Sequence, residues 1–407
     1  MNIQLKNGLR IVGEQMPHVR SVSVGIWVGV GSRAETASEN GISHFMEHML
    51  FKGTEKRSAV QIACEMDAIG GNLNAFTTRE LTCYYAKCVD TDVETVFDIL
   101  SDMYKNSCLA ETETELERGV ILEEISMYED SPEDVAQEML ADLVWSGDPL
   151  GRGIAGTRET VSSITADALR RFMKKYYTAR NTVLAVAGSF DEEKIRMLAE
   201  KYFGEVPAGE KYTDYGLVPF CSGRREKEKD IEQTHIAIGY PGLSQDTPDR
   251  YKMAAFCGAF GGGMSSRLFQ KIREEKGLAY TIYAAPESFK NAGMLNIYAG
   301  VSPENADTVS SLIRAEIEDV LKNGLTEAEI KRSISQMRAG YIMGRESVSG
   351  RMQVLGRNML LYDKIQTVDE VLSGIDSVTK EETEKLARQL LDGEWAEVRV
   401  CPKRKEA

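Results

Sequence analysis

The sequence lacks several features that mark other classes of protein. It has no run of about 18 apolar residues, the length that a membrane-spanning helix needs, so we expect no transmembrane segment. Acidic residues outnumber basic ones, 63 to 49, and the net charge of −14 argues against a nucleic-acid partner. The segment Met1–Val12 has neither the apolar core of a signal peptide nor the Arg- and Ser-rich character of a transit peptide. We therefore expect a cytoplasmic protein.

Cysteine is scarce and irregularly placed. The seven cysteines are odd in number and scattered, with no Cys-x-x-Cys pair. They suit reduced thiols in a reducing compartment better than a disulfide framework or a cysteine-based zinc site. The content of apolar residues, 42%, is nevertheless enough for sizeable cores, and the length predicts more than one domain.

Histidine is scarce as well, and two of the four histidines share one motif. The segment Ser43-His44-Phe45-Met46-Glu47-His48 has the inverted His-x-x-Glu-His spacing of a group of zinc hydrolases. If residues 41–51 are helical, His44 and His48 lie on one face, one turn apart, and can bind one ion. Glu47 then lies beside that ion as the candidate general base. The alternative is a surface helix with two titrating histidines.

A third ligand is expected from another element. The two remaining histidines are less well placed, because His18 follows a proline in a turn and His235 lies in an alternating run typical of a strand. The better source is the acidic segment 111–128, which we expect to be a helix. Its apolar residues Leu116, Val120 and Ile121 predict a buried stripe.

Glutamates on this segment could complete the metal site. Glu117 and Glu124 are seven residues apart and fall close to one line along a helix. Spacing alone does not choose among Glu117, Glu123 and Glu124. For any one of them the alternative is a solvated helix face.

The two halves of the chain are related. Residues 112–120 and 326–334 match at an offset of 214, and the order of predicted strands and helices also repeats, which indicates an internal duplication. A break in composition within 207–230 marks the linker. We therefore predict a zinc-binding domain at 1–210, a linker at 211–230 and a homologous non-catalytic domain at 231–407.

Periodicity predicts the fold class. Alternating runs at 21–30 and 295–301 indicate half-buried strands, whereas amphipathic runs at 91–106 and 304–322 indicate packed helices. Each half is therefore expected to be α+β. The glycine-rich stretch at 261–263 lacks the Gly-Lys-Ser/Thr of a phosphate-binding loop, so we expect a flexible or closely packed turn there.

Together, the motif segment 44–54 and the segment Glu117-Arg-Gly-Val-Ile-Leu-Glu-Glu124 resemble the pitrilysin family of inverted-motif zinc peptidases. This family includes insulin-degrading enzyme and the mitochondrial processing peptidase, and the resemblance extends along nearly the whole chain. It implies two domains of like fold, each a mainly antiparallel sheet with helices packed on one face. It also implies one Zn²⁺ per chain, with Glu124 as the third ligand and Glu117 as a supporting residue.

The resemblance also implies residues that hold the substrate. The segment 72–84 is similar to the family's strand beside the metal, whose backbone near Asn74 and Ala75 pairs with an extended peptide. Arg273 and Tyr280 match an arginine and a tyrosine that contact the substrate and help to stabilise the tetrahedral intermediate. A salt-bridged helix end and a core tyrosine are the alternative for this pair.

Selectivity is implied by two acidic residues. Asp134 and Glu138 lie ten and fourteen residues after Glu124, the offsets at which the processing-peptidase branch recognises an arginine near the cut. We therefore hypothesise a preference for peptides with a basic residue close to the scissile bond. A solvated acidic helix face is the alternative.

The motifs predict a zinc metallopeptidase, and the resemblance implies an endopeptidase that hydrolyses unfolded peptides inside a clamshell chamber. The chain has about the length of one subunit of the two-chain members and carries both the zinc motif and the Arg273/Tyr280 pair. We therefore expect a homodimer in which each metal faces the partner's second domain. The alternatives are a non-catalytic scaffold and a peptide-binding member of the same fold.

Overall fold

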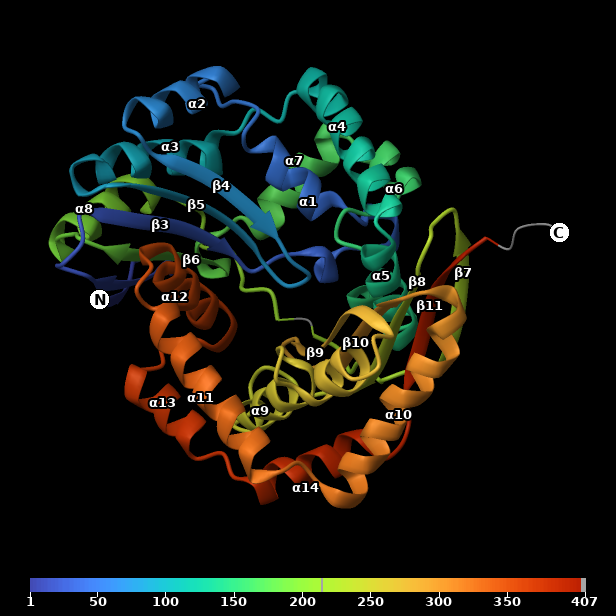
Figure 1. Ribbon diagram of the computed structural model, residues 1–407. Helices are drawn as coiled ribbons and strands as arrows, with labels where there is room; N and C mark the ends of the chain where they lie inside the picture. The colour runs from blue at the N-terminus through green and yellow to red at the C-terminus, as the bar shows by residue number, and fades with distance from the viewer. Residues whose placement is uncertain (214, 404–407) are drawn as a thin grey trace. The chain divides into compact units, whose positions relative to one another are not determined.

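The chain forms two compact units, each assembled from three segments. The computed structural model describes residues 1–213 and 215–403 (Figure 1). Unit 1 consists of Met1–Ser126, Arg152–Asp214 and Met343–Ile365. Unit 2 consists of Met127–Gly151, Tyr215–Ile342 and Gln366–Ala407. Among the described residues, no helix is both long enough and apolar enough to cross a membrane.

Unit 1 is built on a six-stranded sheet with the order β1-β2-β6-β3-β5-β4. The pairing of β2 with β6 is parallel and the other pairings are antiparallel, which leaves β4 at one edge. The strands are β1 (Asn2–Gln4), β2 (Arg10–Gln15), β3 (Ser21–Val28), β4 (Asn72–Thr77), β5 (Thr82–Val89) and β6 (Thr182–Gly188).

Helices and short 3₁₀ turns surround this sheet. The boundary with unit 2 falls within α4, after Ser126. The α-helices are α1 (Ile42–Met49), α2 (Ala59–Ala68), α3 (Val93–Asn106), α4 (Glu111–Asp130), α6 (Arg158–Ser163), α7 (Ala166–Tyr176), α8 (Glu192–Phe203) and α12 (Val348–Tyr362). The 3₁₀ turns are η1 (Ser32–Ala34), η2 (Ala37–Glu39), η3 (Asp90–Asp92) and η5 (Ala179–Asn181).

Both faces of the sheet in unit 1 are covered. Side chains alternate along a strand, so Val24 and Ile26 of β3 join the main core with the helices on one face, whereas Trp27 joins a second core with α12. The indole of Trp27 donates to the sulfur of Met352 on α12 at 3.3 Å. Figure 1 shows α3 and α12 on opposite sides of the sheet. Strand β3 is consequently buried along almost its whole length rather than half-buried as expected.

Unit 2 repeats the same plan with a five-stranded sheet of order β7-β11-β8-β10-β9. The pairing of β7 with β11 is parallel and the other pairings are antiparallel, so β9 occupies the edge that corresponds to β4. The strands are β7 (Gly223–Lys229), β8 (Thr234–Pro241), β9 (Ala279–Ser288), β10 (Gly293–Val301) and β11 (Ala396–Pro402).

The helices of unit 2 also lie on both faces of its sheet. Leu140 and Val144 of α5 pack with the β11 residues Val398 and Val400, whereas α9, α10 and α14 build the core on the other face. The helices are α5 (Pro132–Val144), α9 (Arg250–Gly261), the π-helical turn η6 (Phe269–Glu274), α10 (Ala306–Asn323), α11 (Glu327–Gly344), α13 (Val368–Asp376) and α14 (Lys380–Leu391). The 3₁₀ turns are η4 (Pro149–Gly151) and η7 (Pro303–Asn305).

The predicted fold class is confirmed: two α+β domains of like topology, each a mainly antiparallel sheet with helices packed on it. The expectation that helices cover only one face of each sheet is wrong. Each sheet carries one further helix on its opposite face, and this helix comes from the other half of the sequence. The units therefore differ from the contiguous ranges 1–210 and 231–407, because 127–151 and 343–365 are exchanged. The predicted linker at 211–230 also contains a strand, β7, whose charged residues are those of an exposed sheet edge.

Candidate metal centre

The histidine motif lies on α1, a short helix with a largely buried face. The helix follows Gly41, whose φ of 97° is in the left-handed region that favours glycine. Phe45, Met46 and Met49 anchor the helix in the core of unit 1. The four-residue step brings the rings of His44 and His48 together, with centroids 4.6 Å apart.

Glu124 of α4 faces both imidazoles. Its Oε2 atom lies 3.7 Å from Nε2 of His44 and 3.5 Å from Nε2 of His48. Nitrogen and oxygen ligands about 2.1 Å from a tetrahedral zinc ion stand roughly 3.4 Å apart. The two distances to Glu124 are close to that value, and ligand atoms of all three residues lie within 4.8 Å of one another. The donor set of two imidazoles and one carboxylate is one that zinc accepts.

Glu117 supports His48 from behind. Its Oε1 atom lies 2.8 Å from Nδ1 of His48, and its Oε2 atom lies 2.5 Å from Nζ of Lys52. Burial lowers the pKa of His48, but the hydrogen bonds to Glu117 and Glu124 outweigh it and raise that pKa to about 9. Burial raises the pKa of Glu117, and the bonds from His48 and Lys52 reverse this and leave it below its usual value. Such a carboxylate fixes the tautomer and orientation of a ligating histidine.

His44 has a different environment. Burial, with a smaller effect of His48, lowers the pKa of His44 to about 4, so the ring is neutral near pH 7. Its Nδ1 atom is buried and has no hydrogen-bond partner among the described residues. The side chain is therefore oriented by packing and by the backbone of α1.

Glu47 points toward strand β4. The hydroxyl of Thr77 donates to Oε2 of Glu47 at 2.5 Å. Burial raises the pKa of the Glu47 carboxyl, and the bond from Thr77 opposes that shift. A carboxylate with a raised pKa beside a metal site is suited to take a proton from water and release it again.

Strand β4 offers an open edge next to these groups. Thr78 N–H donates to the carbonyl of Leu81 at 2.8 Å, so the alternation of an antiparallel ladder directs the peptide groups of Ala75 away from β5. The side-chain oxygen of Asn74 accepts the Ala75 N–H at 2.8 Å, as expected of a donor with no ladder partner. Asn74 and Ala75 thus lie on an edge that can pair with an extended peptide.

The acidic helix α4 turns a different face inward than its apolar residues suggest. Ile121 is buried as expected, but Leu116 and Val120 are 69% and 52% exposed, so the predicted stripe is wrong at these two positions. The buried face instead carries Thr114, Glu117, Ile121 and Ile125, and it brings the Glu117 carboxylate to His48. Glu123, one of the alternatives for the third ligand, is exposed.

One buried carboxylate at this site was not expected from the sequence. Glu35 is 4% exposed and accepts hydrogen bonds from the side chain of Asn40 and from the backbone of Gly41 and Ser43. Burial raises the pKa of Glu35 to about 7. No periodic pattern marks Glu35, since it lies outside the helix that it contacts. Thr77 and Lys52 were missed for the same reason.

Arg273 and Tyr280 belong to unit 2. Arg273 lies in η6 and Tyr280 is the second residue of β9, and the guanidinium stands 5.3 Å from the centre of the Tyr280 ring. Tyr280 is 75% exposed, so it is not a core tyrosine. The two side chains form an accessible pair that combines a cation with a phenol.

Asp134 and Glu138 also belong to unit 2, on α5, and both are exposed. Their neighbours Glu133 and Gln137 point to the sheet instead. The hydroxyl of Tyr283 donates to Glu133 at 3.0 Å, and the Gln137 amide donates to the same hydroxyl at 3.2 Å. The helix thus divides its polar residues between an inner set that fixes it to the sheet and an outer acidic set.

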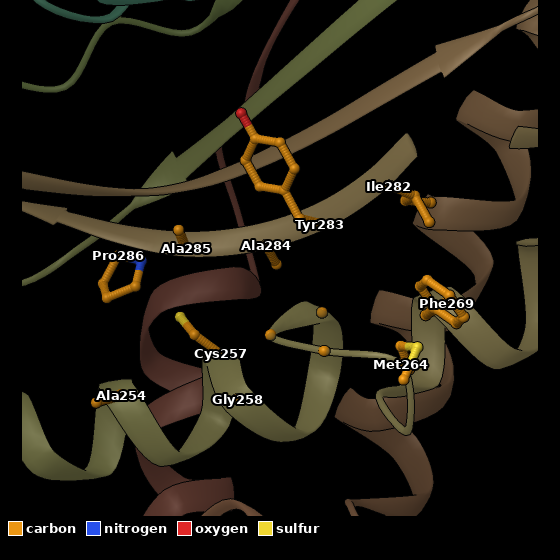
Figure 2. A pocket seen from close by; sticks show the side chains of 13 residues that line it. Ala254, Cys257, Gly258, Met264, Phe269, Ile282, Tyr283, Ala284, Ala285 and Pro286 are labelled. Atoms are coloured by element: carbon orange, nitrogen blue, oxygen red, sulfur yellow. The ribbon is translucent and has the colours of Figure 1, made fainter. Parts of the chain in front are cut away.

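The glycine-rich stretch closes one side of a pocket in unit 2. The pocket has a volume of about 510 Å³ and lies between the end of α9 and strand β9. Figure 2 shows the Tyr283 ring on the side of β9 away from α9, while Cys257 and Met264 face the pocket. Its lining is mostly glycine, alanine and larger apolar residues, and burial raises the pKa of the Cys257 thiol. The pocket therefore has no counterpart of the histidine and carboxylate set of unit 1.

Comparisons with known sequences relate both halves of the chain to one peptidase family. Residues 10–158 match the family described as insulinase (peptidase family M16), and residues 163–337 match the domain described as peptidase M16 inactive domain. A Bacillus subtilis protein named uncharacterized zinc protease YmxG is 40% identical over 98% of this chain and 97% of its own length. An uncharacterized zinc protease of Streptomyces coelicolor is 40% identical over 95% of this chain and 86% of its own length.

Solved structures share the fold. A protease from Helicobacter pylori superposes with a TM-score of 0.93 over 99% of both chains, at 22% identity. A Pseudomonas fluorescens structure described as a peptidase M16 inactive domain gives a TM-score of 0.93 at 17% identity, covering 100% of this chain and 99% of that one. At these identities the likeness concerns the fold.

Proposed function

Since this chain belongs to peptidase family M16, we propose that it is a zinc metalloendopeptidase that hydrolyses unfolded peptides. The observation that carries the proposal is the group formed by His44, His48 and Glu124, with the carboxylate of Glu47 beside it on the same helix. The zinc protease names of relatives at 40% identity support it. The open edge of β4 supplies a place for the substrate next to these groups.

His44, His48 and Glu124 would hold the zinc ion. Bound zinc acts as a Lewis acid, which acidifies water to a pKa of about 7 and polarises a carbonyl oxygen. Glu117 keeps the Nδ1 proton on His48 and so leaves Nε2 free to coordinate. The neutral state of His44 makes its Nε2 available without the loss of a proton.

Glu47 is the proton carrier in this proposal. It accepts a proton from the attacking water and delivers it to the leaving amine. Its partly buried site raises its pKa, so the protonated form that donates to the amine is more stable than that of an exposed glutamate. Thr77 holds one oxygen of this carboxylate in place.

The substrate peptide would extend along β4. Ala75 presents its peptide groups to a new strand once the Asn74 side chain releases the N–H. Recognition through the main chain depends weakly on sequence, and it requires that the substrate be unfolded. The Arg273 and Tyr280 pair is proposed to bind the substrate backbone and stabilise the developing oxyanion. Asp134 and Glu138 are proposed to favour a basic residue near the scissile bond.

The experiment that tests this function is mass spectrometry of a library of unstructured peptides after incubation with zinc-loaded protein. The matched control is Glu47→Gln, which retains every zinc ligand. Fragments produced by the wild type and absent with Glu47→Gln are expected, with cuts enriched near Arg or Lys. Zinc-bound protein that yields no fragments would instead support the non-catalytic scaffold or peptide-binding alternative.

A further inference from the structure

The first turn of α1 has no local cap. Gly41 occupies the N-cap position and has no side chain to accept the free N–H groups of a helix start. Glu35 accepts them instead: its Oε1 lies 2.8 Å from Ser43 N and its Oε2 lies 2.8 Å from Gly41 N. Asn40 adds a third donor through Nδ2 at 3.0 Å. One buried carboxylate thus receives three N–H groups at the start of the helix.

The two histidines on this helix are oriented by different means. His48 has a carboxylate partner for Nδ1, as ligating histidines usually do, whereas Nδ1 of His44 has none within the described part of the chain. His44 directly follows Ser43, whose N–H is bound by Glu35. The direction of the His44 side chain therefore depends on the backbone that Glu35 fixes.

Glu35 is itself held firmly. Arg152 donates to its carbonyl at 3.0 Å, and Asn40 Nδ2 also donates to the carbonyl of Gly153 at 3.0 Å. Gly156 allows close approach here, because an added Cβ would lie 2.4 Å from the carbonyl oxygen of Asn40. The backbone of Glu35 is thus held by the segment before α6, while its side chain holds the first turn of α1.

We propose that Glu35 is a positioning residue for His44. By anchoring the first turn of α1, Glu35 fixes the orientation of the His44 ring, which has no hydrogen bond to Nδ1 to do so. This inference rests on the proposed zinc site. Glu35 does not touch the metal or the substrate; it acts through the backbone of Gly41 and Ser43. Its loss should therefore weaken zinc binding rather than remove a ligand.

The substitution Glu35→Gln tests this role with little change in shape. A glutamine has one oxygen acceptor and one amide nitrogen donor in place of two oxygens. Because both oxygens of Glu35 accept backbone N–H groups, the amide nitrogen must face one of these donors in either orientation. The first turn then shifts, and the His44 ring moves with it.

The experiment measures zinc affinity by competition with a chromophoric chelator. Glu35→Gln is expected to raise the zinc Kd by about tenfold or more, the range known for residues that support metal ligands. Glu117→Gln serves as the positive control. Glu397→Gln is the matched negative control: it removes a carboxylate that is 2% exposed and accepts from Ser310 and Arg399, but lies in unit 2. Its zinc Kd should equal that of the wild type.

A second readout uses the spectrum of the cobalt-substituted protein. A displaced His44 changes the ligand geometry and therefore the visible absorption of Co²⁺, which a purely structural role would leave unchanged. An unaltered zinc Kd and an unaltered cobalt spectrum in folded Glu35→Gln would overturn the inference. If that variant fails to fold by circular dichroism, Glu35→Asp, which retracts the carboxylate by one methylene, is measured by the same criteria. Failure of the wild type to bind zinc would instead overturn the proposed function.

Discussion

Glu117 links two functions at the residue scale, because it orients His48 and also receives the charge of Lys52. Glu117→Gln keeps a hydrogen-bonding side chain but loses the negative charge. We expect zinc affinity near pH 9, where protonation of His48 competes little, to fall by about 10- to 100-fold, the usual cost of losing such a partner. Chelator competition measures this, and an affinity within twofold of the wild type would show that Glu117 only pairs with Lys52.

Zinc binding should also release a proton. In the zinc-free protein the pKa of His48 is raised to about 9, so this ring is charged at pH 7, whereas His44, with a pKa of about 4, is not. Zinc requires neutral imidazole, so about one proton must leave on binding and affinity should rise as pH increases. The rise should be about tenfold per pH unit below the pKa of His48 and should level off above it.

Calorimetry of zinc binding at pH 7 in buffers of different ionisation enthalpy measures this proton count. Glu117→Gln is the informative comparison, because the bond to Glu117 is the first of the interactions that raise the pKa of His48. The variant should release less than one proton. Equal proton release by the wild type and Glu117→Gln would contradict the assignment of Glu117 as the cause of the raised His48 pKa.

Thr77 tests the placement of the general base. Thr77→Val keeps the shape of the side chain but removes the hydroxyl that binds Glu47. We expect kcat to fall by about tenfold, a part of the total contribution of acid–base catalysis, while KM and zinc content stay close to the wild type. Thr77→Ser, which retains the hydroxyl, should recover most of kcat. A change confined to KM would indicate that Thr77 acts through the substrate strand instead.

The sequence predicts this site in part. The spacing of His44 and His48 places both on one helical face, and the structure has them there. Glu35 and Thr77 could not be predicted, because each comes from a segment outside the helix and touches it only in the folded chain. Leu116 was misassigned because apolar character does not distinguish a helix face that meets the core from one that faces solvent.

At the scale of elements, the edge strand β4 carries the substrate hypothesis. Ala75→Pro removes the outward N–H without taking a hydrogen bond from the ladder to β5, and proline is tolerated on sheet edges. We expect kcat/KM for an unstructured peptide to fall by about fivefold, equivalent to about 1 kcal/mol for one hydrogen bond. Ala75→Gly, which keeps the N–H, is the matched control. Steady-state kinetics at equal zinc content measures this. A kcat/KM of Ala75→Pro equal to that of Ala75→Gly and the wild type would contradict the hypothesis.

The elements themselves follow closely from periodicity, with one systematic exception. Runs such as 91–106 and 304–322 are helices, α3 and α10, within a few residues of their predicted bounds. The strands at 21–30 and 295–301 were expected to have a solvated face and do not, because α12 covers the first and α5 covers the second. A hydrophobic pattern shows that a helix has an apolar side, but it does not show which sheet that side will cover.

At the scale of the whole molecule, the exchanged helices make each half of the sequence incomplete. A fragment of residues 1–210 would lack α12 and expose Trp27, Val183 and Ala185 on one face of its sheet. We expect fragments 1–210 and 211–407 to be insoluble when expressed separately and to form a soluble complex when expressed together. Co-expression followed by gel filtration tests this, and a soluble, folded 1–210 fragment alone would contradict it.

The assembly state is a prediction at the same scale. Because one chain carries both the metal motif and the Arg273/Tyr280 pair, we expect a homodimer at micromolar concentration. Size-exclusion chromatography with light scattering measures the mass directly, and a monomer at all concentrations would contradict the expectation. Mixing the Arg273→Ala protein with the Glu47→Gln protein would then test whether the Arg273/Tyr280 pair of one subunit serves the metal of its partner. Peptidase activity in the mixture, absent from each variant alone, is the expected result.

The exchange of α5 and α12 also bears on how the protein is made. On a translating ribosome, the N-terminal sheet can form once residue 188 has emerged, but its second apolar face stays bare until the segment ending at Ile365 has been synthesised. One of these late contacts, between Trp27 and Met352, spans 325 residues, so they form slowly and leave the nascent sheet open to aggregation or chaperone binding. The half that carries the histidine motif is therefore completed only when synthesis is nearly finished.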